Sequence, residues 1–198
     1  MALEVLDKLL TALKSTPRTG WMLRGVPAAI AETIAEHLAE SSILALYISE
    51  KLSSCGINVN PYRAAAIAVS HDLAEAIVGD IVKKAVELIG KDVKEKAEME
   101  ALRELGDVLP AKLAIEYIEA STTESLVAKT AETLSTLLQA IRYVKHGYTE
   151  VCEIVMSMAD SLENLLEKGG EKWRLCIGEE VRKAIEIASN LCSKIEKR

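Results

Sequence analysis

Apolar residues recur every three or four positions along almost the whole chain, and this spacing restricts the fold more than any other feature. Near the N-terminus, Val5, Leu9 and Leu13 form one such stripe, which is typical of an amphipathic helix. No stretch of the sequence shows convincing strand alternation. The 198 residues include 10 Gly, 4 Pro and no Phe, a composition that favours helices. The sequence therefore predicts an all-α fold.

Glycine, proline and capping residues divide this pattern into about eight or nine helices in one domain, residues 1–198. Asn60-Pro61 is typical of a helix start, and Asp92 with Glu95 and Ser121 with Glu124 resemble capping boxes. Residues 15–27, STPRTGWMLRGVP, are too irregular for a helix and are predicted to form a functional loop. The expected helices cover approximately residues 2–14, 28–53, 61–78, 81–89, 92–105, 110–119, 121–145, 149–167 and 171–197.

Charge and hydropathy limit the partners and the location. The net charge of −6 argues against a general nucleic-acid binder, which would carry a basic stripe. No apolar run reaches the ~18 residues of a membrane span, and Glu4 and Asp7 do not suit a signal peptide. We therefore expect a cytoplasmic protein with no membrane or nucleic-acid partner.

The four cysteines, Cys55, Cys152, Cys176 and Cys192, follow no zinc-like spacing. In a cytosolic chain they are expected to be buried thiols.

Two histidines lie on helix faces that are predicted to point inward. His37 follows Ile34 within the expected helix 28–53, and His71 is followed by Asp72 and Glu75 in an otherwise apolar stretch. A single histidine in such a position is usually a hydrogen-bonded core residue. Two carboxylates beside an imidazole on a partly buried face are costly without a cation, however. This cluster therefore predicts a divalent metal site.

The ordered motifs resemble those of a known family. Glu36-His37, followed by His71-Asp72 in the run HDLAEAIVGD (71–80), resembles the HD-domain metal-dependent phosphohydrolases. The loop PRTGW (17–21) and the segment LLQA (137–140) narrow the resemblance to the 5'-deoxynucleotidase-like branch. The similarity covers about residues 5–145. It implies an all-α HD domain with one divalent metal ion, of the set Mn, Co, Mg, Ni, Zn and Fe.

The resemblance also implies a ligand set. His37, His71 and Asp72 match three metal ligands of the family. The fourth family ligand is an Asp located eight residues before the Gln-Ala of the LLQA-like segment, where this chain has Glu132. Glu is one methylene longer than Asp, and we expect Glu132 to replace the Asp as the fourth ligand.

Four further residues match family positions near the substrate. Glu75 is expected to act as an acid or base beside the metal, and Asp80 to position substrate or water. Arg18 suits phosphate binding, and Trp21 could cover a base or sugar. The alternatives are a solvated Arg18 and a Trp21 that fastens the loop to the core.

The expected function is metal-dependent release of phosphate from deoxynucleoside 5'-monophosphates. One alternative is a catalytically weakened HD module that binds nucleotides, and another is hydrolysis of a different phosphoester such as a nucleoside triphosphate. The resemblance also implies a homodimer. The C-terminal helices, residues 149–198, either complete the core or form the dimer face.

Overall fold

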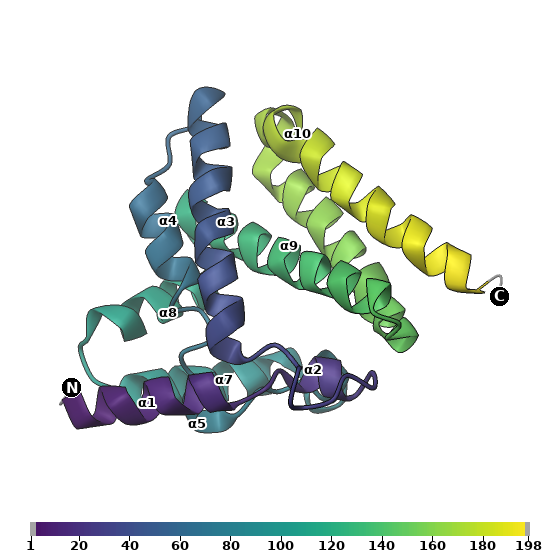
Figure 1. Cartoon of the computed structure of the whole chain (residues 1–198). Helices are drawn as coiled ribbons and strands as arrows, with labels where there is room; N and C mark the ends of the chain where they lie inside the picture. Colours follow the sequence, from purple (N-terminus) through teal and green to yellow (C-terminus); the bar gives the residue numbers. More distant parts are fainter. Residues whose placement is uncertain (1–2, 197–198) are drawn as a thin grey trace.

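The chain folds into a stack of helices, as the apolar spacing predicts. The structure is a computed structural model that describes residues 3–196, and within them it contains ten α-helices, one 3₁₀ turn and no β-sheet. Helix α3 stands almost upright in Figure 1, with α1 and α7 crossing at its foot and α9 beside it. The helices are α1 (Leu3–Ser15), α2 (Thr19–Met22), α3 (Ile34–Ser54), α4 (Pro61–Ala68), α5 (Glu75–Val78), α6 (Lys83–Ile89), α7 (Lys91–Glu104), α8 (Leu109–Glu119), α9 (Thr123–Lys145) and α10 (Cys152–Glu196), with the 3₁₀ turn η1 (Thr149–Val151). The all-α prediction is confirmed.

Helix α3 begins six residues later than the sequence spacing predicted. Thr33 caps it, accepting a hydrogen bond from the Glu36 backbone N–H, while the Glu36 carboxylate accepts one from the Thr33 N–H. This capping box satisfies first-turn donors that have no partner within a helix. Residues 28–33 therefore lie outside the helix, mostly in turns, and Ile30 is exposed.

The expected helix 61–78 is also interrupted. Asn60 caps α4 as predicted, but α4 ends at Ala68, and residues 69–74 form turns before the single-turn helix α5. The prediction of a continuous helix was wrong here because helical apolar spacing does not distinguish a helix from successive tight turns. His71 and Asp72 consequently lie in the turn segment.

Two further capping predictions need correction. The box that starts α9 is formed by Thr122 and Ser125, one residue after the predicted Ser121 and Glu124. Helix α7 begins after Gly90 and has no side-chain cap, so the Asp92 pattern does not act as one.

Two hydrophobic clusters meet at the histidines. The larger cluster joins the C-terminal half of α3 to α4, α9 and α10, and the smaller one joins the start of α3 to α1, α5, α7 and α8. Along the chain, Ala68 belongs to the larger cluster and Leu73 to the smaller one, with His71 between them. The fold thus places the polar segment at the junction of two apolar cores.

Helix α10 covers the larger cluster and consists of two arms. The first arm covers residues 152–169 and the second 171–196, and the chain bends at Gly170, where φ is +83°, a value that glycine adopts readily. Leu162 and Leu166 are fully buried in the larger cluster. Helix α10 therefore contributes buried side chains to the larger hydrophobic cluster.

The cysteines form two disulfides, which corrects the expectation of free thiols. Cys55, just after α3, pairs with Cys176, and Cys152 pairs with Cys192 near the end of the second arm. The partners are 121 and 40 residues apart in the sequence, so no local spacing could indicate them. Both bonds fasten the second arm of α10.

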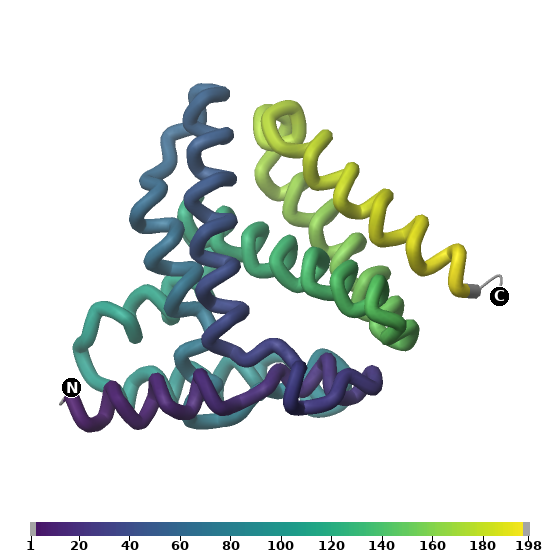
Figure 2. Tube along the Cα trace, viewed as in Figure 1, coloured from purple at the N-terminus to yellow at the C-terminus, as the bar shows by residue number. Residues whose placement is uncertain are grey.

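The two ends of the described chain lie on opposite sides of the molecule (Figure 2). Within residues 3–196, no helix combines the length and the apolar character needed to cross a membrane.

Candidate functional site

Three of the predicted metal ligands lie together. His37 comes from the first turn of α3, and His71 and Asp72 come from the turns between α4 and α5. One ligand atom from each of the three residues lies within 4.8 Å of the others. The two imidazole rings meet edge to face, with centroids 5.2 Å apart.

The hydrogen bonds of the two imidazoles leave one nitrogen of each available. Nδ1 of His71 lies 2.6 Å from the carbonyl oxygen of Ala68 and donates to it, so Nε2 carries the lone pair. Nδ1 of His37 lies 3.4 Å from Oγ of Ser135. Nε2 of His37 is buried and has no hydrogen-bond partner among the described residues, and the buried Nε2 of His71 lies 3.1 Å from Oδ2 of Asp72. Buried polar atoms without partners are rare, and two imidazole nitrogens beside a carboxylate fit a bound divalent metal.

Electrostatics keeps His37 in the form that binds metal. Burial and the nearby Arg18 guanidinium hold the pKa of His37 well below its ordinary value. The imidazole is therefore neutral at neutral pH, as a ligand must be.

Glu75 is buried beside this cluster. Its Oε1 lies 3.9 Å from Nζ of Lys94, and its Oε2 has no hydrogen-bond partner among the described residues. Burial and the nearby carboxylates of Asp72 and Asp80 raise the pKa of Glu75 well above its ordinary value. A carboxyl group of this kind can hold a proton near neutral pH.

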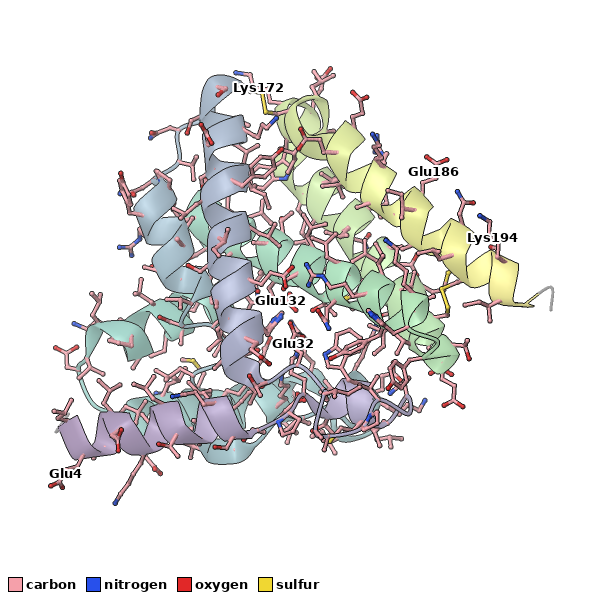
Figure 3. All side chains as sticks on the ribbon, viewed as in Figure 1. Glu4, Glu32, Glu132, Lys172, Glu186 and Lys194 are labelled. Atoms are coloured by element: carbon pink, nitrogen blue, oxygen red, sulfur yellow. A yellow bond between two sulfur atoms is a disulfide. The ribbon has the colours of Figure 1, made fainter. Side chains whose placement is uncertain are left out.

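Glu132 projects from α9 into the same region and is half-buried. Its Oε2 accepts hydrogen bonds from the hydroxyls of Thr133, at 3.0 Å, and Tyr117, at 3.4 Å. In this arrangement its carboxylate is not part of the three-residue group of potential ligands. Figure 3 shows Glu132 and Glu32 near the middle of the molecule, beside the lower half of α3.

A cavity of about 700 Å³ opens over the cluster, and we call it the first cavity. His71, Asp72, Glu75, Asp80 and Glu132 line it. So do seven basic side chains: Arg18, Arg24, Lys83, Lys84, Lys91, Lys94 and Lys129. A cavity of this size can hold a nucleotide-sized ligand, and its basic side chains complement a phosphate.

Arg18 directly precedes α2, a single-turn helix within residues 15–27, where the sequence predicted no helix. Its guanidinium donates to Oγ1 of Thr136 at 3.1 Å and lies 3.7 Å from the Glu32 carboxylate. Its side chain is 17% exposed and lines the first cavity. Arg18 is therefore fixed in place next to the predicted ligands, unlike a solvated surface cation.

Trp21 and Asp80 hold the 15–27 loop against the cluster. The indole of Trp21 is 2% exposed, and its Nε1–H donates to Oε2 of Glu32 at 3.0 Å. The Asp80 carboxylate accepts a hydrogen bond from the backbone N–H of Thr19. Both residues line the first cavity and also tie the loop to neighbouring elements.

The sequence reasoning missed Glu32. It is 6% exposed and joins Trp21, Arg18 and His37, whose Nδ1 lies 4.0 Å from Oε1 of Glu32. Burial raises its pKa to about 7. From the sequence, the helix was expected to begin at residue 28, and Glu32 was not singled out. The Thr33–Glu36 capping pattern was the signal that could have placed Glu32 in a turn before the helix.

Tyr117 and Lys129 are two more site residues that the sequence reasoning missed. The Tyr117 ring lies 4.9 Å from the His71 ring, centroid to centroid, and Nζ of Lys129 lies 3.8 Å from the centre of the Tyr117 ring. These residues come from α8 and α9, and no motif marks either.

Comparison with known proteins agrees with this geometry. A family profile described as "HD domain" matches residues 10–172. The 5'-deoxynucleotidase hdd1 of Schizosaccharomyces pombe is 32% identical over 145 residues, covering 68% of each chain. The human 5'-deoxynucleotidase HDDC2 is 31% identical, covering 69% of this chain and 65% of its own length. The match thus spans about two thirds of these relatives.

Solved structures share the fold. A conserved hypothetical protein from Pyrococcus furiosus has a TM-score of 0.76 and 32% identity, covering 92% of this chain and 99% of its own. A protein from Pyrococcus horikoshii has a TM-score of 0.77 and 27% identity over the same shares. The profile match over most of the sequence, together with the His37, His71 and Asp72 arrangement, shows that the chain belongs to the HD-domain family.

Proposed function

We propose that the protein is a metal-dependent phosphohydrolase that releases phosphate from deoxynucleoside 5'-monophosphates. The observation that carries this proposal is the convergence of His37, His71 and Asp72 beside a basic cavity, with the Nε2 atoms of both histidines buried. The names of the S. pombe and human relatives support the choice of substrate.

In this proposal, Nε2 of His37, Nε2 of His71 and the Asp72 carboxylate hold one divalent ion. Such an ion lowers the pKa of water and stabilises negative charge on phosphoryl oxygens. Glu132 is proposed as the fourth ligand. Its carboxylate already borders the first cavity, but it has to give up its bonds to Tyr117 and Thr133 to bind.

Glu75 is proposed to act as the acid or base that transfers a proton during hydrolysis. The free Oε2 and the raised pKa of Glu75 suit a group that gives a proton to the leaving 5'-oxygen or takes one from water. Its neighbour Lys94, 3.9 Å away, favours the ionised form once a proton leaves.

Arg18 is proposed to bind the phosphate, because its guanidinium borders the first cavity and is held by Thr136. Asp80 positions the substrate indirectly, by fixing the loop that carries Arg18 through Thr19. Trp21 is buried against Glu32, which favours the fastening of the loop over stacking on a base or sugar.

A phosphate-release screen tests this function. Deoxynucleoside and ribonucleoside monophosphates, and the triphosphates, are incubated with Mn²⁺, Co²⁺, Mg²⁺, Ni²⁺, Zn²⁺ or Fe²⁺. We expect turnover of deoxynucleoside monophosphates with at least one ion. Turnover of triphosphates alone would favour the alternative of a nucleoside triphosphate hydrolase. Absence of turnover with every ion would favour the alternative of a nucleotide-binding module without catalysis.

We also propose that the chain forms a homodimer. Ile43 and Leu46 are exposed on α3 and are proposed to take part in such an interface. Light scattering on the purified protein should give twice the 21.5 kDa mass of the chain, and a monomer mass would reject the proposal.

A further inference from the structure

A second cavity lies beside the first one and has no part in the proposed reaction. Its volume is about 840 Å³, and the start of α9 and the bend of α10 line it. Lys91, Ile118 and Lys129 line both cavities, so the two are neighbours.

The charge of the second cavity is strongly one-sided. Four lysines line it, Lys91, Lys129, Lys168 and Lys172, against a single carboxylate, that of Glu171. Of the four, only Lys91 makes an ion pair with a described residue, at 2.8 Å from Glu95. Burial lowers the pKa of Lys129; the carboxylates of Glu132 and Glu95 act against this, and the charges of Lys91 and Lys168 add to it. The lysines therefore repel one another, and a bound anion would relieve that repulsion.

The remaining lining residues differ in character from the lysines. Ile57, Ile118, Leu126 and Leu165 supply an apolar surface. Trp173 lines the same cavity and is 2% exposed, yet its indole N–H has no hydrogen-bond partner among the described residues. The site thus offers cations and an apolar surface together.

We propose that the second cavity binds a nucleoside triphosphate, with the phosphates against the four lysines and the base against Ile57, Ile118 and Leu126. The volume is within the range of small-molecule sites. Four lysines match the charge of about −4 on a free triphosphate. This binding requires neither a metal ion nor turnover in the first cavity.

The two tryptophans of the chain allow a direct test, because Trp21 lines the first cavity and Trp173 the second. In a Trp21→Phe variant, Trp173 is the only tryptophan. ATP is titrated in EDTA, so that no hydrolysis occurs, and the emission is corrected for absorbance. We expect a saturable change in Trp173 emission. A calorimetric titration of the unmutated chain with ATP should give the same Kd. This second measurement tests the binding even if the Trp21→Phe variant does not fold.

Charge variants locate the binding. Lys168 and Lys172 are exposed on α10, and replacing both by Ala should weaken ATP binding roughly tenfold or more. Lys183 and Lys194 are exposed on the second arm and do not line the cavity; Lys194 lies near the end of that arm in Figure 3, well away from Lys172 at the bend. The Lys183→Ala/Lys194→Ala protein should bind like the unmutated chain.

Binding of inorganic triphosphate tests the contacts to the phosphates separately from the contacts to the base. It should bind more weakly than ATP, because it cannot use the apolar surface. No saturable change, an equal Kd in both lysine variants, or equal affinity for inorganic triphosphate would each overturn the proposal. Because all titrations are metal-free, their failure is independent of a failure of the phosphate-release screen.

Discussion

The turns around His71 and the C-terminal helix α10 bury side chains of opposite character. In the turns, the start of α5 and the facing start of α3, the side chains of His37, His71 and Glu75 are almost inaccessible, and His37 and Glu75 each leave one polar atom without a hydrogen-bond partner among the described residues. In α10, the most deeply buried side chains are apolar, such as Leu162 and Leu166, and two disulfides fasten the second arm.

This contrast distinguishes residues that are expected to bind metal or act in the reaction from residues that stabilise the fold. A buried polar atom without a partner costs about 1–3 kcal/mol, so the turn segment weakens the fold unless a ligand satisfies it. Helix α10 gains stability from apolar burial and from the cross-links. Mutations in the first region should therefore affect metal binding and turnover, and mutations in the second should affect unfolding.

Replacing Asp72 should have the largest effect. Asp72→Ala removes one of three clustered ligands, and we expect loss of bound metal and a fall in turnover of roughly 10³-fold. Elemental analysis and phosphate release measure the two effects. Asp92→Ala, an exposed carboxylate on α7, is the matched control. An Asp72→Ala protein that retains its metal would remove Asp72 from the site.

Removing a disulfide should have the next largest effect, in this case on the stability that helix α10 contributes. Cys55→Ser/Cys176→Ser releases a constraint between residues 121 positions apart, and the free energy of unfolding should fall by roughly 2–4 kcal/mol. Denaturant titration of the oxidised protein measures it. Metal content should stay unchanged in the folded variant, and its loss would show that α10 also supports the metal site.

Glu75→Gln should lower turnover roughly 10²-fold while the metal content is maintained, because only the transferable proton is lost. Glu95→Gln serves as the control, since Glu95 lines the same cavity but pairs with Lys91 near its edge. Turnover near that of the unmutated protein would exclude Glu75 from the mechanism.

Arg18→Ala should raise KM roughly tenfold and leave the metal content unchanged, as expected for loss of a charged phosphate contact. Arg24 also lines the first cavity but pairs with Glu153 at 3.0 Å. Arg24→Ala should therefore change KM less. Equal kinetics for the two variants would leave Arg18 without a special role.

The smallest effect concerns the pH dependence of stability in the metal-free protein. Burial raises the pKa of Glu32 from 4.5 to about 7. Between these values the folded state binds more protons than the unfolded state, so the free energy of unfolding falls as the pH rises. Glu32 contributes at most about 1.4 kcal/mol per pH unit to this slope. Glu32→Gln should make the slope shallower, and an unchanged slope would contradict the raised pKa.

The sequence predicted the all-α fold and the clustered side chains of the candidate metal site. His37, His71 and Asp72 could be found because their types and order form a recognisable motif. Their surroundings could not, because they depend on turns and on distant elements. Glu32 is buried only because α3 begins at Ile34, and Tyr117 reaches His71 from α8. The disulfides likewise join residues that only the tertiary structure brings together.

The most direct test of the central claim is a crystal structure of the protein grown with Mn²⁺, using anomalous scattering to locate the ion. We expect one ion per chain, about 2.0–2.3 Å from Nε2 of His37, Nε2 of His71 and an Asp72 oxygen, with the Glu132 carboxylate turned from Tyr117 to the ion. An ion bound elsewhere, or imidazoles that do not contact it, would contradict the proposed metal site. An ion held by His37, His71 and Asp72 with Glu132 still on Tyr117 would reject Glu132 alone.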